Sequence, residues 1–219
     1  MKETLASNYE VMILAGTSDF YHDLSRLSER ALETIVVSES ELTNIGSLEV
    51  STAALAVVKM KPHRKPVLSH SDFTLVLDAI RDPGNLGTII RTADWYGIKN
   101  IIASTDTTEM YSPKVINATM GSFLRVDVFY TALELFLPSL KMQSYGAFLD
   151  GINVHKMKPL GGGLIVIGNE ARGISPMVEK LISHRITIPR YGHAESLNAA
   201  VATAIVLDVF FTAKKSQRR

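Results

Sequence analysis

The chain has 219 residues, of which 46% are hydrophobic and 21% charged, so it is long enough for a substantial core and is not of disordered composition. It contains no cysteine, which excludes disulfides, thiolate metal sites and cysteine nucleophiles. The net charge is only +1, but residues 1–58 hold three cations and nine acids, a net of −6, and the remainder carries +7. A polyanionic partner is therefore expected to meet the second part of the chain.

The termini and the histidines exclude further classes of protein. No apolar run approaches the roughly 18 residues needed to cross a bilayer, and the first ten residues lack the apolar stretch of a signal peptide. We therefore expect a cytoplasmic protein without membrane association. The six histidines are scattered without metal-ligand spacing, so we expect no metal site.

The first part of the chain predicts a small domain followed by a linker. Apolar runs at residues 11–15, 34–37 and 53–58 predict a small α/β unit over residues 1–58. Residues 59–71 form a basic, proline-bearing linker, and residues 214–219 form a basic tail with four cations in six residues. The linker cations are Lys59, Lys61, Arg64 and Lys65.

Residues 72–213 predict an α/β domain with a parallel sheet. Six apolar runs that do not alternate with polar residues are typical of strands covered on both faces. They lie at residues 73–77, 100–103, 124–129, 147–149, 164–167 and 185–188. Thr131 with Glu134 suggests a capping box, and Ser175 before Pro176 suggests a helix start. The last helix, from about Ser196, is apolar nearly all round and is expected to be buried in the core or in a subunit interface.

The first polar turn that leaves a strand is RDPGNLGTIIRTAD, residues 81–94. In open parallel sheets, ligands bind beyond the carboxyl ends of the strands, so this turn is a candidate site. Gly87 lies one turn before Arg91 and would let a ligand approach the backbone. The structural alternatives are that Asn85 caps the helix and that Arg91 pairs with Asp94 on its surface.

Two more turns carry polar residues at strand exits. In IGNEARGIS, residues 167–175, two glycines around Glu170 predict a tight turn with exposed amides, although a plain turn with a solvated Glu170 is the alternative. In ITIPRYGHAESLNAA, residues 186–200, Ser196 either caps the last helix or belongs to a site. Asn198 is predicted two residues inside that helix, where a buried amide needs partners.

Together, the three turns resemble the motifs of the SpoU (TrmH-like) branch of the SPOUT RNA methyltransferases. The glycine fingerprint of dinucleotide-binding folds and the P-loop are both absent. The matching strings are Asn85-Leu86-Gly87 with Arg91-Thr92-Ala93, Gly168-Asn169-Glu170 with Gly173-Ile174-Ser175, and Ile188-Pro189 with Ser196-Leu197-Asn198. The resemblance covers residues 72–213 well, and residues 1–58 resemble a cut-down form of the small RNA substrate-binding domain that many members carry.

The resemblance implies a Rossmann-like SPOUT domain with a carboxyl-terminal trefoil knot, a homodimer, and S-adenosylmethionine (SAM) as cofactor. The implied reaction is methyl transfer to a ribose 2′-hydroxyl of RNA, with rRNA favoured over tRNA. It also implies a polar catalytic set and a backbone cofactor site. The catalytic set is Asn85, Arg91, Glu170, Ser196 and Asn198, and the cofactor site is Gly168, Ile188 and Leu197.

RNA is expected on the basic side of the chain. The candidate contacts are Lys59, Lys61, Arg64, Lys65 and Arg190. Arg190 departs from the family pattern, because an apolar residue usually follows Pro189 there. Simple solvation is the alternative for the linker cations. The alternative functions are a non-catalytic RNA-binding or ribosome-assembly protein on the same scaffold and, more remotely, a nucleotide-dependent oxidoreductase.

Because a guanidinium is a poor base, we expect Arg91 to stabilise the developing alkoxide, with Asn85 and Asn198 orienting it. Glu170 is then expected to fix Arg91 or an amide nearby.

Overall fold

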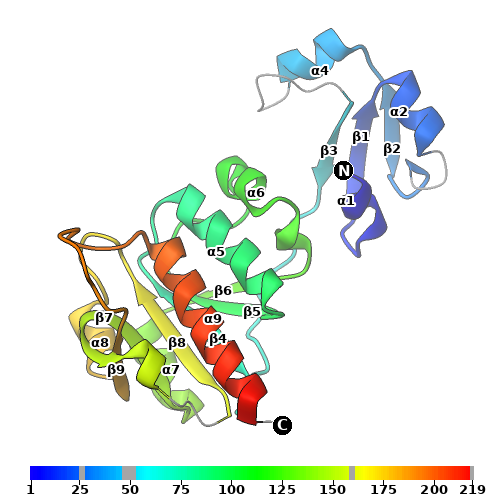
Figure 1. Ribbon diagram of the computed structural model, residues 1–219. Helices are drawn as coiled ribbons and strands as arrows, with labels where there is room; N and C mark the ends of the chain where they lie inside the picture. The colour runs from blue at the N-terminus through cyan, green and yellow to red at the C-terminus, as the bar shows by residue number, and fades with distance from the viewer. Residues whose placement is uncertain (25–27, 46–52, 158–160, 218–219) are drawn as a thin grey trace. The chain divides into compact units, whose positions relative to one another are not determined.

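The computed structural model describes residues 1–24, 28–45, 53–157 and 161–217. The chain divides into two compact units, Met1–Pro62 and His63–Arg219 (Figure 1). Among the helices in the described ranges, none has the length and apolar content that would let it cross a membrane.

The first unit is a small α/β fold around three strands. They are β1 (Val11–Gly16), β2 (Glu33–Val36) and β3 (Ala54–Val58), accompanied by helices α1 (Lys2–Ala6), α2 (Ser18–Asp23) and α4 (Glu39–Ile45). β1 is central, with β2 parallel and β3 antiparallel to it. Leu5, Val11 and Leu14 form the buried core.

The second unit contains a six-stranded sheet in the order β6-β5-β4-β8-β7-β9. Every neighbouring pair is parallel, which confirms the predicted parallel sheet. The strands are β4 (Phe73–Asp78), β5 (Asn100–Ser104), β6 (Asp127–Thr131), β7 (Ser144–Asn153), β8 (Gly163–Gly168) and β9 (His184–Thr187).

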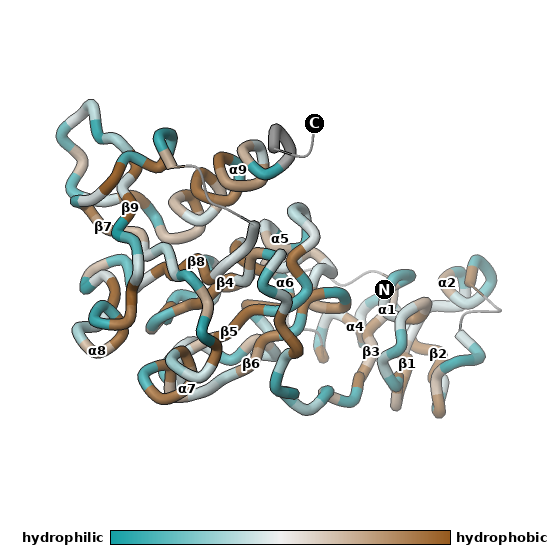
Figure 2. Tube along the Cα trace, turned by 90° about the horizontal axis from the view of Figure 1, so that it is seen from below, coloured by the Kyte–Doolittle hydropathy of each residue, from teal (hydrophilic) through white to brown (hydrophobic). Residues whose placement is uncertain are grey.

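Helices cover both faces of this sheet. Leu75 and Leu77 of β4 face a core cluster shared with α5, α6 and α9, whereas Val76 faces a second cluster with α7 and α8. Figure 2 shows α9 and α7 on opposite sides of the strands. The helices are α5 (Pro83–Trp95), α6 (Pro113–Thr119), α7 (Leu133–Leu140), α8 (Pro176–Glu179) and α9 (Ala199–Gln217), with short 3₁₀ turns η1 (Ser122–Leu124) and η2 (Val154–Lys156).

Local details differ from the sequence-based predictions in three places. The strand predicted from residue 124 begins only at Asp127, because η1 occupies Ser122–Leu124. The capping box predicted at Thr131 does not form, because Thr131 is the last residue of β6 and pairs with Ser104. The last helix begins at Ala199 rather than near residue 196. Ser175 does precede α8 as predicted, and the trefoil knot stays a prediction.

Candidate active site

The three polar turns lie after β4, β8 and β9, at the carboxyl edge of one parallel sheet. β4 and β8 are neighbours, so their turns leave the sheet side by side. β9 is separated from β8 by β7, and the segment after β9 leads into α9, which packs on α5. Sheet order therefore joins two of the motifs, and helix packing brings in the third.

The start of α5 leaves the Asn85 side chain available for contacts beyond the helix. Asp82 is the N-cap, and its carboxylate accepts a hydrogen bond from the Asn85 backbone nitrogen at 2.7 Å. Pro83 occupies the first helical position, where a missing N–H does no harm. The alternative that Asn85 caps this helix is therefore wrong.

Asn85 joins the other two motifs through its side-chain amide. Its Nδ2 donates to a carboxylate oxygen of Glu170, and its Oδ1 accepts a 2.7 Å bond from Asn198 Nδ2. Because an ionised carboxylate only accepts hydrogen bonds, Glu170 determines which end of the Asn85 amide faces it. With Nδ2 of Asn85 facing Glu170, its Oδ1 faces Asn198. Asn198 must then present its Nδ2 to Asn85, so Glu170 sets the orientation of both amides.

Asn198 is the N-cap of α9. Its Oδ1 accepts hydrogen bonds from the backbone nitrogens of Ala200 at 2.9 Å and Val201 at 3.3 Å. The prediction that Ser196 caps the helix and the prediction that Asn198 is buried inside it are both wrong, since Asn198 is exposed and precedes the helix. The Asn198 side chain thus caps the helix through Oδ1 and donates to Asn85 through Nδ2.

Arg91 and Ser196 stand apart from this unit. Arg91 is exposed on α5, and Asp94, its suggested partner, instead forms a two-pronged contact with Arg125 at 2.8 and 2.9 Å. Within the described parts of the chain, no hydrogen bond or ion pair links Arg91 or Ser196 to Asn85, Glu170 or Asn198. The guanidinium of Arg91 is therefore available to a ligand, and Glu170 fixes an amide rather than Arg91.

A cavity of about 990 Å³ opens beside the turns that follow β8 and β9, and no residue of the turn after β4 lines it. Its lining includes all three predicted cofactor residues, Gly168, Ile188 and Leu197, together with Glu170 and Ser196. Cavities of this size, with apolar walls and a few polar groups, suit ligands of drug-like dimensions. Among the described residues, no group of three or more His, Asp or Glu side chains is placed to hold a metal ion.

Charges on the cavity wall are partly balanced. The Arg185 guanidinium lies 3.7 Å from the centre of the Phe148 ring and pairs with Glu179 and, at 2.5 Å, with Asp150. The hydrogen bond from Arg185 lowers the pKa of Asp150. Sequence reasoning missed a further cation, Arg172, which lines the cavity, is exposed, and has no acidic partner among the residues that the structure describes. A single arginine in a polar loop belongs to no repeating sequence pattern, so the sequence alone does not identify Arg172 as a functional residue.

The loop after β8 needs Gly168 for a close backbone approach and Gly173 for a left-handed backbone conformation. Asn169 and Gly173 exchange backbone hydrogen bonds of 3.0 and 2.8 Å, and Gly173 has φ +69°. A Cβ on Gly168 would lie 2.2 Å from the Gly173 carbonyl carbon. The amides of Ala171 and Arg172, predicted to be exposed, instead donate to Asn169 Oδ1 at 3.0 and 3.1 Å.

Gly87 also serves packing, which corrects its predicted role in ligand approach. It is buried, and a Cβ there would lie 2.4 Å from the Cβ of Ala118 on α6. The glycine therefore lets α5 and α6 pack closely.

Several predicted RNA contacts already have partners. Lys59 pairs with Glu10 at 2.9 Å, and Lys61 lies 3.8 Å from the centre of the Tyr9 ring. In the second unit, Lys65 lies 5.2 Å from the centre of the Phe136 ring. Arg64 and Arg190 are exposed, and Arg190 lines the cavity. In the predicted basic tail, Lys214 pairs with Asp72 at 3.1 Å, while Arg218 and Arg219 lie outside the described residues.

Comparison with known proteins agrees with the three motifs. The model of the SpoU rRNA Methylase family matches residues 72–208. The 23S rRNA (guanosine(2553)-2′-O)-methyltransferase RlmP of Bacillus subtilis is 30% identical over 183 residues, covering 82% of this chain and 73% of that protein.

Solved structures agree as well. A protein from Porphyromonas gingivalis assigned to the TrmH family of RNA methyltransferases is 33% identical, with a TM-score of 0.81 over 95% of this chain and 84% of that one. An AdoMet-bound rRNA methyltransferase from Sinorhizobium meliloti is 25% identical, with a TM-score of 0.82 over 99% of this chain and 85% of that one. The chain therefore belongs to the SpoU rRNA methylase family.

Proposed function

We propose that this chain is a SAM-dependent RNA methyltransferase that methylates a ribose 2′-hydroxyl. One observation carries the proposal: Glu170, Asn85 and Asn198, from three separate motifs, form one hydrogen-bonded unit at the edge of the sheet. Glu170 also lines a cavity of about 990 Å³. Family membership and the relatives' names support the same activity.

The cavity fits the methyl donor in size and chemistry. The backbone of Gly168, Ile188 and Leu197 would hold SAM, because all three residues line the cavity and backbone groups supply both donors and acceptors. When bound, SAM supplies a methyl group attached to a positively charged sulfur. The chain's own residues then have to place the ribose hydroxyl and manage its proton.

Positioning is the main task of the polar residues. Glu170 locks the Asn85 amide, and Asn198 holds its other end, so Asn85 presents a fixed surface to the ribose. A guanidinium is a poor base, so Arg91 stabilises the oxyanion that develops as the hydroxyl gives up its proton to solvent water. Ser196 lines the cavity and completes the proposed polar set.

We assign rRNA as the substrate in preference to tRNA, because the RlmP relative is named for 23S rRNA. We propose a cytoplasmic location on the same ground, because this relative is a bacterial protein that acts on rRNA. Arg172 and Arg190 line the cavity and are exposed, so they are suited to contact RNA phosphates.

We further propose that the first unit contacts RNA through Lys59 and Lys61, because residues 1–58 of that unit carry a net charge of −6 and repel phosphate. Replacing both lysines with alanine should reduce the slope of log binding constant against log salt by about 1.4–1.8. A doubly substituted chain with an unchanged slope would exclude these lysines from the interface.

A homodimer is the proposed assembly. Trp95 on α5 is 86% exposed and Val201 on α9 is 48% exposed, and the two helices pack on each other. Contiguous exposed apolar surface marks protein interaction sites, so we propose that the surface around these two side chains forms the dimer interface. Sedimentation should show a dimer that Trp95→Glu converts to a monomer, whereas a wild-type monomer would refute this assignment.

The decisive experiment measures transfer of a labelled methyl group from SAM to transcribed rRNA and tRNA, followed by mapping of 2′-O-methyl sites. Arg91→Ala should lose about 100- to 1,000-fold in rate while calorimetry shows unchanged SAM affinity. Binding of RNA without any methyl transfer would support the non-catalytic alternative, and binding of NAD but not SAM would support an oxidoreductase.

A further inference from the structure

The turn that follows β4 adopts a backbone conformation that its residue disfavours. Ala79 has φ +59°, in the left-handed region. Met120 and Lys141 also have positive φ, but each ends a helix, where this conformation is common. Ala79 ends no helix, and a residue with a Cβ stays in this region only when its surroundings hold it there.

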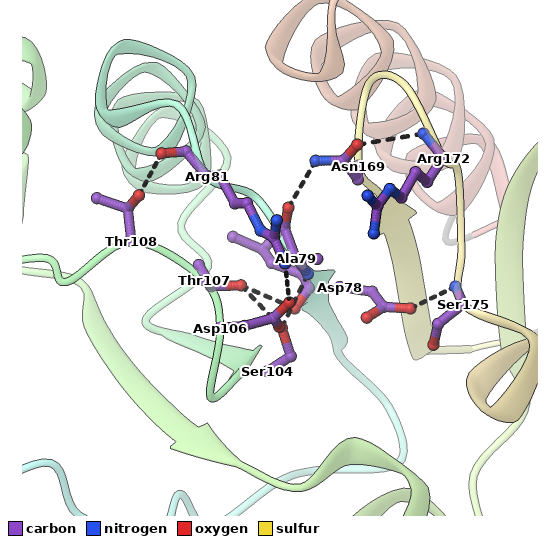
Figure 3. A network of polar contacts seen from close by, with 11 residues as sticks. Asp78, Ala79, Arg81, Ser104, Asp106, Thr107, Thr108, Asn169, Arg172 and Ser175 are labelled. Atoms are coloured by element: carbon purple, nitrogen blue, oxygen red, sulfur yellow. Dashed lines mark hydrogen bonds and ion pairs between the residues drawn. The ribbon is translucent and has the colours of Figure 1, made fainter.

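Two side chains hold Ala79 through its backbone (Figure 3). Ser104, at the end of β5, accepts a 2.8 Å hydrogen bond from the Ala79 nitrogen. On the other side, Asn169 Nδ2 donates to the Ala79 carbonyl oxygen at 2.9 Å. The turn is therefore fixed from the β5 side by a hydroxyl and from the β8 side by an amide.

The other end of the Asn169 amide holds the loop that carries Glu170. Its Oδ1 accepts from the nitrogens of Ala171 and Arg172 at 3.0 and 3.1 Å. One side chain thus ties the turn that leads into α5 to the loop immediately after Glu170. The Ser175 nitrogen, which donates to Asp78 at 2.7 Å, adds a second link between the same two segments.

We propose that Asn169 is a positioning residue that sets the distance between Asn85 and Glu170. The proposal rests on the methyltransferase function, because it assigns the Asn85–Glu170 contact to the reacting site. Asn85 lies six residues after Ala79, and Glu170 directly follows Asn169. The remaining side of the turn is already anchored, since the Thr108 nitrogen donates to the Ile80 oxygen at 2.9 Å. Asn169 therefore supplies the connection towards Glu170.

An amide suits this position because it donates at one end and accepts at the other. Aspartate has the same shape and can still accept from Ala171 and Arg172. It has no hydrogen to donate to the Ala79 oxygen, and it brings a negative charge to that carbonyl. Asn169→Asp therefore removes the connection to Ala79 while leaving the internal bonds of the Glu170 loop in place.

The test compares Asn169→Asp with Asn153→Asp, a matched control. Asn153 also uses Oδ1 to accept a backbone hydrogen bond, from His155 at 2.9 Å, but it does not line the cavity. For Asn169→Asp we expect kcat to fall about 10- to 100-fold, because small misplacements of reacting groups cost rate. The KM for RNA and the Kd for SAM should stay within about threefold. The control should match the wild type.

Amide hydrogen exchange provides a readout that does not depend on methylation. In Asn169→Asp, the Ala79 amide should exchange faster, while the amides of Ala171 and Arg172 keep their protection. Adding Ala79→Gly should restore part of the lost kcat, because glycine adopts this conformation without strain. A double variant no faster than the single one would overturn the role given to the Ala79 conformation.

The outcomes separate this proposal from the proposed function. A wild-type protein that methylates no RNA refutes the function, and the exchange of the Ala79 amide still decides whether Asn169 holds the turn. An Asn169→Asp protein with wild-type kcat overturns the positioning role. An Asn169→Asp protein that loses SAM affinity and melting temperature as well as kcat also overturns the positioning role, because this result indicates general damage to the loop.

Discussion

Substitution of Gly168, where β8 ends, tests whether the following loop depends on a close backbone approach. A Cβ on Gly168 would lie 2.2 Å from the Gly173 carbonyl carbon and 2.3 Å from the Ile174 nitrogen. Carbon atoms in contact prefer about 3.5–4.0 Å, so the backbone segments around Gly168 and Gly173 would have to separate by about 1.3–1.8 Å. Overpacking costs about 1–3 kcal/mol. Because the obstructing atoms belong to the backbone and cannot rotate away, we expect Gly168→Ala to cost about 3 kcal/mol.

Gly173 is the matched comparison within the same loop. Its φ is +69°, and a Cβ there would have no neighbour within 4 Å. The cost of Gly173→Ala is therefore conformational only, about 1–2 kcal/mol. Asparagine tolerates the left-handed region better than alanine, so Gly173→Asn should cost less than Gly173→Ala.

Urea unfolding and calorimetry with SAM measure these effects. Gly168→Ala should lose both stability and SAM affinity, because separating these backbone segments moves Gly168 and Glu170, which both line the cavity. Gly173→Ala should lose stability and keep most of its affinity. If Gly168→Ala is as stable as the wild type, or if Gly173→Ala costs more, the argument from close backbone approach is wrong.

Three further predictions concern the helices. Gly87→Ala should lower the free energy of unfolding by about 1–2 kcal/mol despite its better helix propensity, because its Cβ meets Ala118; an unchanged urea midpoint would contradict this. Burial is the largest single influence on the pKa of Asp94 and raises it, but the hydrogen bonds from Arg125 and Ser122 and the charge of Arg125 together lower that pKa below the ordinary 3.8. The stability lost in Arg125→Gln should therefore be constant at neutral pH and shrink below about pH 4, and a loss independent of pH would refute the pairing. Asn198→Ser should keep the cap of α9 and lose methyl transfer, whereas Asn198→Ala should also lose about 1 kcal/mol of stability; equal kcat in the two variants and the wild type would remove Asn198 from the site.

The parallel sheet could be predicted from the sequence because its signal is local. Strands covered on both faces need unbroken apolar runs, and such runs occur at β4, β5 and β8. Polar residues at strand exits then indicate a site, because carboxyl ends of parallel strands share one edge. The family motifs made Asn85, Glu170 and Asn198 candidates before any contact between them was known.

Roles of individual groups could not be predicted, because they depend on partners distant in the chain. Asn85 and Asp82 are both able to cap α5, and only the positions of Glu170 and Asn198 show which side chain is engaged elsewhere. In the same way, the sequence around Gly87 predicts a ligand contact, but the structure shows that Gly87 packs against Ala118 of α6.

The class of fold, the strands and the three motifs could be predicted because apolar runs and turn residues are properties of neighbouring positions in the chain. Which atoms of those motifs meet depends on how the helices and strands pack. The bond between Asn198 and Asn85 joins residues 113 positions apart, and it exists because α9 packs on α5. The positive φ of Ala79 likewise could not be predicted from the sequence, because alanine lacks the conformational freedom of glycine. Ser104 and Asn169, which lie outside the turn, hold Ala79 in this conformation.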